Sequence, residues 1–291
     1  MVSLSVCVCT YNRAESLRAM LESIKEQRGA PPFELIVVDN NSTDHTREVV
    51  QGFSTLPVRY ARETRQGLSH ARNCALREFR GDYLLFLDDD VRLAPECCSA
   101  YRNAIAAFPQ ADCFGGRILP DWKGTPPAWV GERLPLLDGL LVWLDLGEAT
   151  RPFAEDEAGP FGASFALSRR LIASVGEFHA ELGCKGEGRG RGEETEWFGR
   201  AMQLGAQRIY VGDALCYHRV DPARLSLARL FEYGVESGIA HRHIAGEDRD
   251  GSLFRLLGFA LRGVLQLAKG RGDRFRQCVI NMGIEYDALR H

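Results

Sequence analysis

Apolar residues in the first 120 positions follow two alternating patterns. Continuous apolar, β-branched runs are typical of strands covered on both faces, and they occupy 3–9, 33–39, 58–62 and 82–88. Between these runs apolar residues recur at helical spacing, which predicts helices over 14–28, 43–51 and 68–79. Strands separated by single helices predict an α/β fold with a mostly parallel, doubly wound sheet flanked by helices.

The pattern changes after residue 120. Proline, glycine and tryptophan predict a surface excursion from 121, and strand-like runs follow at 159–168 and 208–218. Between them a Gly/Arg loop at 185–192 precedes a helix over 193–203. We expect one domain over 1–218, with halves at about 1–120 and 121–218, and a helical extension over 219–291.

Composition narrows the class of protein. A chain of 291 residues that is 45% hydrophobic with a net charge of −3 is typical of a soluble globular protein and does not favour nucleic-acid binding. Its nine scattered cysteines predict reduced, mostly buried thiols. The first residues, MVSLSVCVC, lack the features of a signal peptide, so we expect a cytoplasmic protein.

Three consecutive carboxylates, Asp88, Asp89 and Asp90, end the strand predicted at 82–88. In a parallel sheet, ligands bind outside the carboxyl ends of strands, where Asn12 and Asp39 also lie. Adjacent like charges raise carboxyl pKa values unless a cation compensates, and Mg²⁺ or Mn²⁺ prefers such oxygen ligands. On an extended segment Asp88 and Asp90 would face one way and Asp89 the other. The alternative is a solvated acidic turn or helix cap.

Four motifs accompany these carboxylates in order: Thr10-Tyr11-Asn12, VVDNNSTD (37–44), GLSHARN (67–73) and GEETEW (192–197). The set, with its DXD-like triplet, resembles the family-2 glycosyltransferases, which are inverting enzymes of GT-A fold that use nucleotide sugars. The resemblance covers the first half and extends more loosely to His218. It implies hexosyl transfer from a nucleoside diphosphate sugar, UDP by preference, to a saccharide or lipid-linked hydroxyl in surface polysaccharide or glycoconjugate synthesis. Residues 1–120 would then bind the donor and 121–218 the acceptor.

The resemblance also implies roles for single residues. Asp39 would accept a hydrogen bond from the base, Asp88 would hold the ribose, and Arg72 would bind phosphate or pin Asp39 and Asp88. Asp90 and His218 would ligate Mn²⁺ or Mg²⁺, although a histidine after a strand is also a common packing residue. The nucleotide-sugar site would comprise Thr10, Tyr11, Asn12, Arg13, Asp39, Arg72, Asn73, Asp88 and Asp89, with His70 as a further candidate.

A general base is expected at the start of the helix over 193–203. Relatives carry a Glu-Asp pair there, whereas this chain has Glu193-Glu194, so Glu194 takes the place of the catalytic aspartate. The additional methylene shifts the carboxylate by roughly an ångström, which affects catalysis unless the backbone compensates. Glu193 is the alternative base, and Glu196 lies in the same turn. Acidic residues are also common at helix N-termini for electrostatic reasons alone.

Two further features concern substrate access. The loop over 185–192 contains Lys185, Arg189 and Arg191 among glycines, which favours a lid over the donor or else a solvated loop. Trp122, Trp129 and Trp143 are candidates for stacking on acceptor sugars, or for core packing.

The helical pattern over 253–269 has Arg255, Arg262, Gln266 and Lys269 on one stripe and apolar residues elsewhere. This favours a helix lying on the inner face of the cell membrane, or one packed against the catalytic domain or a second subunit of a homo-oligomer. It has too few consecutive uncharged residues to span a bilayer.

Two other functions are compatible with the sequence. A nucleotidyltransferase also combines an α/β sheet with metal-bound carboxylates, but CTYNRAES after the first strand lacks the glycine-rich loop with a lysine. A non-catalytic nucleotide-sugar-binding module is the other alternative, because glutamate occupies the position of the base. The sugar, the acceptor and the linkage are not predicted.

Overall fold

The computed structural model describes residues 2–29, 32–127, 130, 135–186, 190–245, 253–268 and 270–289. The chain forms two compact units. The first comprises 1–121, 142–187 and 193–219, and the second comprises 122–141, 188–192 and 220–291.

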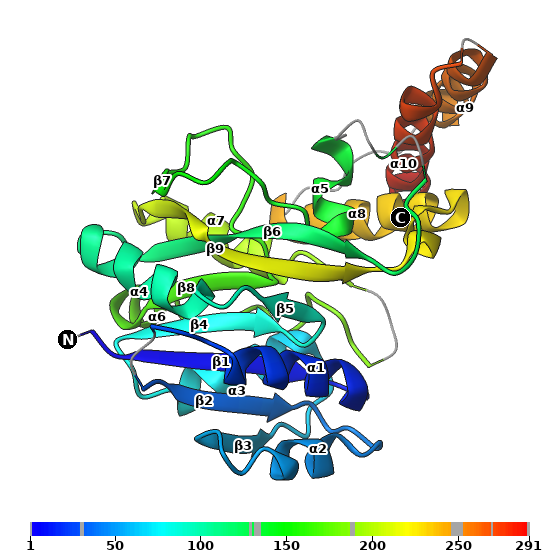
Figure 1. The fold of residues 1–291 in the computed structure, drawn as a ribbon. Helices are drawn as coiled ribbons and strands as arrows, with labels where there is room; N and C mark the ends of the chain where they lie inside the picture. The colour runs from blue at the N-terminus through cyan, green and yellow to red at the C-terminus, as the bar shows by residue number, and fades with distance from the viewer. Residues whose placement is uncertain are drawn as a thin grey trace. The chain divides into compact units, whose positions relative to one another are not determined.

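Parallel strands form one half of the sheet in the first unit (Figure 1). They are β1 (Leu4–Thr10), β2 (Glu34–Asp39), β3 (Val58–Arg62) and β4 (Tyr83–Asp88), in the order β3-β2-β1-β4. The register pairs Thr10 with Asp39 and Cys9 with Asp88. The polar residues that end β1, β2 and β4 therefore lie at the same edge of the sheet, as predicted.

The other half of the sheet continues in the order β8-β6-β9-β5. Its strands are β5 (Val91–Leu93), β6 (Cys113–Trp122), β8 (Ser164–Ser168) and β9 (Arg208–Val220), with β7 (Arg151–Pro152) paired to β9. The pairs β4–β8, β6–β8 and β5–β9 are antiparallel. The α/β prediction is confirmed, while the sheet is mixed because its second half departs from the parallel pattern.

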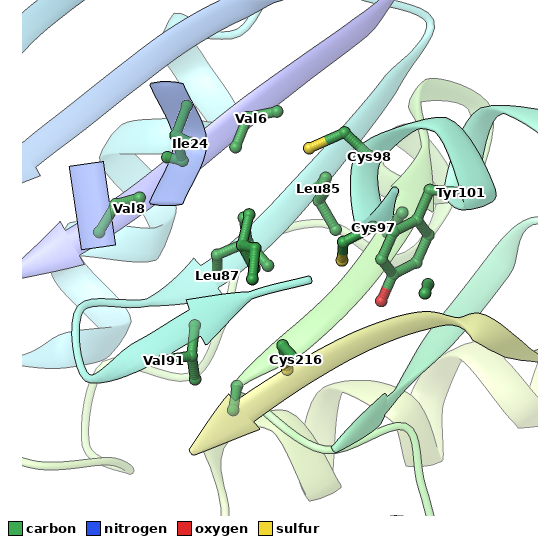
Figure 2. Close-up of a cluster of buried hydrophobic side chains, with 14 of the residues drawn as sticks. Val6, Val8, Ile24, Leu85, Leu87, Val91, Cys97, Cys98, Tyr101 and Cys216 are labelled. Atoms are coloured by element: carbon green, nitrogen blue, oxygen red, sulfur yellow. The ribbon is translucent and has the colours of Figure 1, made fainter. Parts of the chain in front are cut away.

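Helices cover both faces of this sheet. One face carries α1 (Ala14–Lys25), α2 (Thr46–Gly52) and α4 (Cys97–Ala107). Figure 2 shows the core beneath them, where Leu85 and Leu87 of β4 lie with Val6 and Val8 of β1. Cys97, Cys98 and Tyr101 join this core from α4, and Cys216 joins it from β9.

The opposite face carries α3 (Leu68–Glu78), α6 (Arg169–Val175) and α7 (Glu193–Gln203). Leu84 and Phe86, which alternate with Leu85 and Leu87 along β4, pack on this side. Trp197 of α7 stacks on Phe178, with 5.4 Å between ring centroids. The continuous apolar composition of β4 thus reflects burial on both faces, and it fixes α3 and α7 beside the strand that carries Asp88.

The second unit is helical. Its elements are α5 (Pro135–Leu141), the 3-10 helix η2 (Pro222–Leu225), α8 (Leu227–Ala245), α9 (Leu253–Ala268) and α10 (Gly272–Leu289). Helix α10 packs against α8 and α9, and Gly234 and Gly283 allow the backbones of α8 and α10 to approach closely. Within the described residues, none of the helices combines the length and apolarity that a bilayer crossing needs.

Candidate active site

Asp39 ends β2 with a buried carboxylate whose two oxygens are both engaged. Oδ1 accepts a hydrogen bond from the backbone N–H of Ser42 at 2.8 Å, and Oδ2 accepts one from the Tyr60 hydroxyl at 2.5 Å. Burial, followed by the bond to Asp39, raises the pKa of Tyr60 to about 12. Helix α2 begins only at Thr46, so Asp39 closes a turn and does not cap that helix.

The loops after β1 and β2 are joined by Asn12. Its backbone N–H donates to Ser42 Oγ at 2.9 Å, and its side-chain oxygen accepts from the Thr43 N–H at 2.7 Å. Asn12 has a positive φ of 49°, which asparagine tolerates better than most residues. These bonds hold Thr43 in a loop, which explains why α2 starts three residues later than predicted. Tyr11 is half-buried beside them.

The aspartate triplet turns at the end of β4. Asp88 ends the strand, while Asp89 and Asp90 form the turn to β5. Arg13 Nη1 lies 3.0 Å from Asp89 Oδ1 and 3.1 Å from Asp90 Oδ2, and the Thr10 hydroxyl donates to Asp89 Oδ2 at 2.7 Å. The prediction that Asp89 faces away from Asp90 is therefore wrong, because the alternation of an extended strand stops at Asp88.

The cations near Asp88 and Asp89 do not fully offset the cost of bringing these carboxylates together. Partial burial and then the neighbouring Asp90 raise the pKa of Asp88 to about 7, against the lowering effect of Arg72. Burial raises the pKa of Asp89 to about 6, although Arg13 opposes it. The Asp88 side chain remains 34% exposed, whereas that of Asp89 is 5% exposed. Of Asp88 and Asp89, Asp88 is thus the one that a ligand can reach.

His218 approaches the same triplet from β9. It is buried, it pairs with Val91 in the register of β5 and β9, and its Nε2 lies 3.5 Å from Asp90 Oδ1. Ligands of one Mg²⁺ lie roughly 3 Å apart, so Asp90 and His218 fit two positions around such an ion. No group of three or more potential metal ligands occurs among the described residues. The donor set therefore fits an ion that takes its remaining ligands from diphosphate and water.

Arg72 lies at the centre of the site. Its guanidinium is buried, donates from Nη1 to Glu193 Oε1 at 2.8 Å, and lies 3.8 Å from Glu194 Oε2 and 3.9 Å from Asp88 Oδ1. The rings of Phe165 and Phe178 lie 5.4 and 5.5 Å from its Cζ. Burial lowers the pKa of Arg72, but the three carboxylates more than offset this and raise it. Its ionic contacts connect Asp88 with the start of α7, whereas the sequence also suggested Asp39.

The two glutamates at the start of α7 differ in access. Glu193 is buried, and burial together with the charge of Glu194 raises the pKa of Glu193, while the charge of Arg72 opposes this rise. The Glu194 side chain is 25% exposed. Glu196 is engaged with Arg200 at 2.6 Å. Glu194 is therefore the member of this turn with the access that a general base needs, and Glu193 anchors Arg72.

Gly162 is a site residue that the sequence did not indicate. A Cβ at this position would lie 2.8 Å from Arg72 Nη2 and 3.5 Å from Glu194 Oε1. Its carbonyl faces Arg72 Nη2 at 3.4 Å, and the next carbonyl, of Ala163, accepts from the Asp88 N–H at 3.2 Å. A lone glycine among many carries no recognisable sequence signal, so only the fold reveals this contact.

Asn73 has a different surrounding from Arg72. Its amide donates to the Phe178 carbonyl at 2.9 Å and accepts from the Phe178 N–H at 2.7 Å. Both hydrogen-bonding groups thus serve to hold the segment around Phe178, which contacts Arg72.

His70 is half-buried on α3. At the start of the same helix, the Leu68 N–H donates to the Cys184 carbonyl at 2.8 Å.

Two cations of the 185–192 loop, Lys185 and Arg191, have protein partners. Lys185 Nζ lies 2.9 Å from Glu181. In the second unit, Arg191 donates to Ser237 at 3.2 Å and lies 4.0 Å from the Tyr233 ring centroid. Arg189 and Trp129 lie outside the described residues, Trp122 ends β6, and Trp143 is half-buried. The lid and the stacking roles stay predictions.

Sequence comparisons match this chain to known proteins. The model of the family described as glycosyl transferase family 2 matches residues 5–172. A glucosyl-dolichyl phosphate glucuronosyltransferase of Haloferax volcanii is 27% identical over 243 residues, which cover 81% of this chain and 72% of that protein. The succinoglycan biosynthesis protein ExoM of Rhizobium meliloti is 27% identical over 256 residues, which cover 85% of this chain and 77% of that protein.

A solved structure shows the same fold. It is a mannosyltransferase from Pyrobaculum calidifontis in complex with GDP-Man and Mn²⁺. It aligns with a TM-score of 0.60 and 20% identity over 98% of this chain and 88% of that chain. The GT-A architecture expected from the sequence is therefore confirmed.

Proposed function

This chain belongs to glycosyl transferase family 2, and from this premise we propose that it is a metal-dependent, inverting glycosyltransferase. It moves a hexosyl group from a nucleoside diphosphate sugar to a hydroxyl of a saccharide or lipid-linked acceptor. Its relatives in glycan assembly support a role in surface polysaccharide or glycoconjugate synthesis.

The observation that carries this proposal is the position of Arg72. A single buried guanidinium contacts Asp88 at the donor edge and both glutamates at the start of α7. A donor held at Asp88 would thus have its reacting end beside Glu194. Transfer requires a base close to the reacting carbon of the donor, because positioning accounts for a large share of the rate of such reactions.

The end of β2 would bind the base. The contacts of Asp39 with Ser42 and Tyr60 hold its carboxylate in one orientation, and each oxygen keeps a second lone pair for a base N–H. Uracil presents such an N–H, which favours UDP. The mannosyltransferase of the same fold is in complex with GDP-Man, so UDP and GDP donors are both to be tested. Thr10, Tyr11 and Asn12 border this site.

The diphosphate would bind at the aspartate turn. Asp90 and His218 would hold Mn²⁺ or Mg²⁺, which would stabilise negative charge on the departing diphosphate. Arg13 contacts Asp89 and Asp90 with a side chain that is 51% exposed, so it is placed to reach a phosphate oxygen. Asp88, which lies on the Arg72 side, is the candidate for the ribose hydroxyls.

Glu194 would act as the general base. Its carboxylate takes the proton of the acceptor hydroxyl as that oxygen bonds to the anomeric carbon. The bond from this carbon to the diphosphate oxygen breaks on the opposite side, and the electron pair leaves with the nucleoside diphosphate. Configuration at the carbon is therefore inverted. Glu193 keeps Arg72 in place beside the reacting groups.

The proposal is tested by nucleoside diphosphate release from UDP-sugars and GDP-sugars, with Mn²⁺ or with EDTA. We expect release and transfer that require metal, that are lost in Asp90→Ala, and that fall at least 100-fold in Glu194→Gln. Glu194→Asp restores the carboxylate of relatives and serves as the conservative control. Activity that is unchanged by chelation and by Asp90→Ala would contradict the metal assignment.

The two alternatives give distinct results in the same assays. Pyrophosphate release from a nucleoside triphosphate would identify a nucleotidyltransferase. Calorimetric binding of a nucleotide sugar without turnover, unaffected by Glu194→Gln, would identify a non-catalytic binding module.

A further inference from the structure

Helix α9 presents an uncovered row of leucines. The side chains of Leu257, Leu261 and Leu265 are 57%, 64% and 49% exposed. Their spacing of four residues places them on one face of the helix. The opposite side packs on α10, where Gly263 lies close to Phe275 and Cys278. Three neighbouring exposed leucines form an apolar surface of the kind that marks an interaction site.

The charged residues on α9 and just after it are mostly positive. Helix α9 contains two arginines and no carboxylate. Arg255 pairs with the buried Glu285 of α10 at 2.9 Å, whereas Arg262 is exposed beside the leucines. Arg271, which lies between α9 and α10, and Arg274, in the first turn of α10, are also exposed. Residues 253–276 contain six arginines and lysines and one aspartate. The partner of this surface should therefore be apolar and negatively charged.

We propose that the leucine row of α9 docks on a lipid surface rich in anionic headgroups. The leucines would enter the acyl boundary while Arg262, Arg271 and Arg274 remain among the headgroups. A second copy of this chain fits less well, because two facing α9 helices would oppose their arginines without any carboxylate on the helix to pair with. This surface is separate from the chemistry proposed for the first unit.

Cosedimentation of the whole protein with vesicles tests this assignment. Vesicles of phosphatidylcholine alone are compared with vesicles that contain about one third phosphatidylglycerol. We expect at least tenfold tighter binding to the anionic vesicles, weakened by added salt because the attraction is screened. Equal binding to both compositions, or binding to neither, would overturn the proposal.

Two sets of variants test separately how the leucines and the arginines contribute to vesicle binding. Leu257→Gln, Leu261→Gln and Leu265→Gln combined should reduce anionic-vesicle binding at least tenfold, as should Arg262→Glu with Arg274→Glu. Leu204→Gln is the control, because Leu204 is 61% exposed in the first unit and should leave binding unchanged. Circular dichroism checks that each variant keeps its helices. Unchanged binding in the leucine variant would contradict the proposal. So would a wild-type protein that is dimeric and binds no vesicles, and that the leucine substitutions convert to a monomer.

Discussion

Arg72 and Glu193 form a buried ion pair, with 2.8 Å between Nη1 and Oε1, that connects α3 to the first turn of α7. Burying one charge without its partner is costly, so each of these residues depends on the other. The same guanidinium lies near Asp88 and Glu194. The pair thus fixes the relative position of the donor carboxylate and the proposed base.

Removal of Arg72 should destabilise the protein. Arg72→Ala leaves Glu193 buried without its cation, and we expect a loss of about 3 to 5 kcal/mol in the free energy of unfolding, measured by urea denaturation. Arg77→Ala on the same helix is the control. Arg77 is 45% exposed and its buried partner Glu63 also pairs with Arg65, so we expect a loss of less than about 1 kcal/mol. Similar losses in the two variants would argue against a central role for Arg72.

Substitutions of Glu194 and of Glu193 should have different effects on kinetics. Glu194→Gln should lower kcat at least 100-fold while the donor dissociation constant stays within about twofold. Glu193→Gln should instead weaken the hold on Arg72 and lower kcat less than Glu194→Gln does. Donor titration, initial rates and thermal unfolding on both variants provide the comparison. A larger loss of kcat in Glu193→Gln, with a well-folded protein, would make Glu193 the base.

The raised pKa of Asp88 predicts a pH-dependent cost to the metal-free protein. Its ordinary pKa lies near 4, and in the folded state it rises to about 7. Between these values the folded protein keeps a proton that the unfolded chain has released, so stability falls as pH rises through this window. Asp88→Asn should therefore raise the melting temperature relative to the wild type, more at pH 8 than at pH 4.

Asp82→Asn is the matched control, because the pH dependence of stability expected from Asp82 is opposite to that from Asp88. The backbone and hydroxyl of Ser3 donate to Asp82 and lower its pKa, so its charged form stabilises the folded state above the ordinary carboxyl pKa. This variant should lower the melting temperature at neutral pH and converge with the wild type in acid. A difference between Asp88→Asn and the wild type that does not change with pH would contradict the electrostatic argument.

Gly162 should be intolerant of a side chain. Gly162→Ala places a methyl group 2.8 Å from Arg72 Nη2, and we expect kcat/KM to fall about tenfold as Arg72 is displaced. Gly52→Ala is the control, because its Cβ meets nothing within 4 Å and a helical alanine stabilises by about 0.5 to 1 kcal/mol. Initial rates and melting temperatures distinguish the two effects. Wild-type kinetics in Gly162→Ala would show that the space beside Arg72 is not required.

The sequence predicted the elements whose patterns are local. Continuous apolar runs located β1 to β4 within one residue, and the helix over Glu193–Gln203 was predicted with its observed bounds. Strand β6 was missed because Gly115 and Gly116 interrupt its apolar pattern. A Cβ at Gly116 would lie 2.6 Å from the Tyr101 hydroxyl and 2.7 Å from the Ala214 carbonyl, so distant packing selects this glycine.

The candidate site was predictable at strand ends and less so elsewhere. Asp39 and Asp88 follow buried strands, which is a local signal. That Arg13 bridges Asp89 and Asp90 depends on a turn, and that Arg72 meets Glu193 depends on residues 121 positions apart. Sequence spacing does not encode these contacts, because they form only when the sheet and the helices on it are assembled.

The most direct test of the proposed donor site is a thermal-shift measurement with UDP, GDP and Mn²⁺, separately and together. Ligand that binds the folded state raises the midpoint of unfolding. We predict that one nucleoside diphosphate with Mn²⁺ raises the wild-type midpoint by more than the sum of the two separate effects, and that Asp90→Asn abolishes this excess. A nucleotide-induced rise that is the same in EDTA, or no rise with either nucleotide, would contradict joint binding of metal and diphosphate at the aspartate turn.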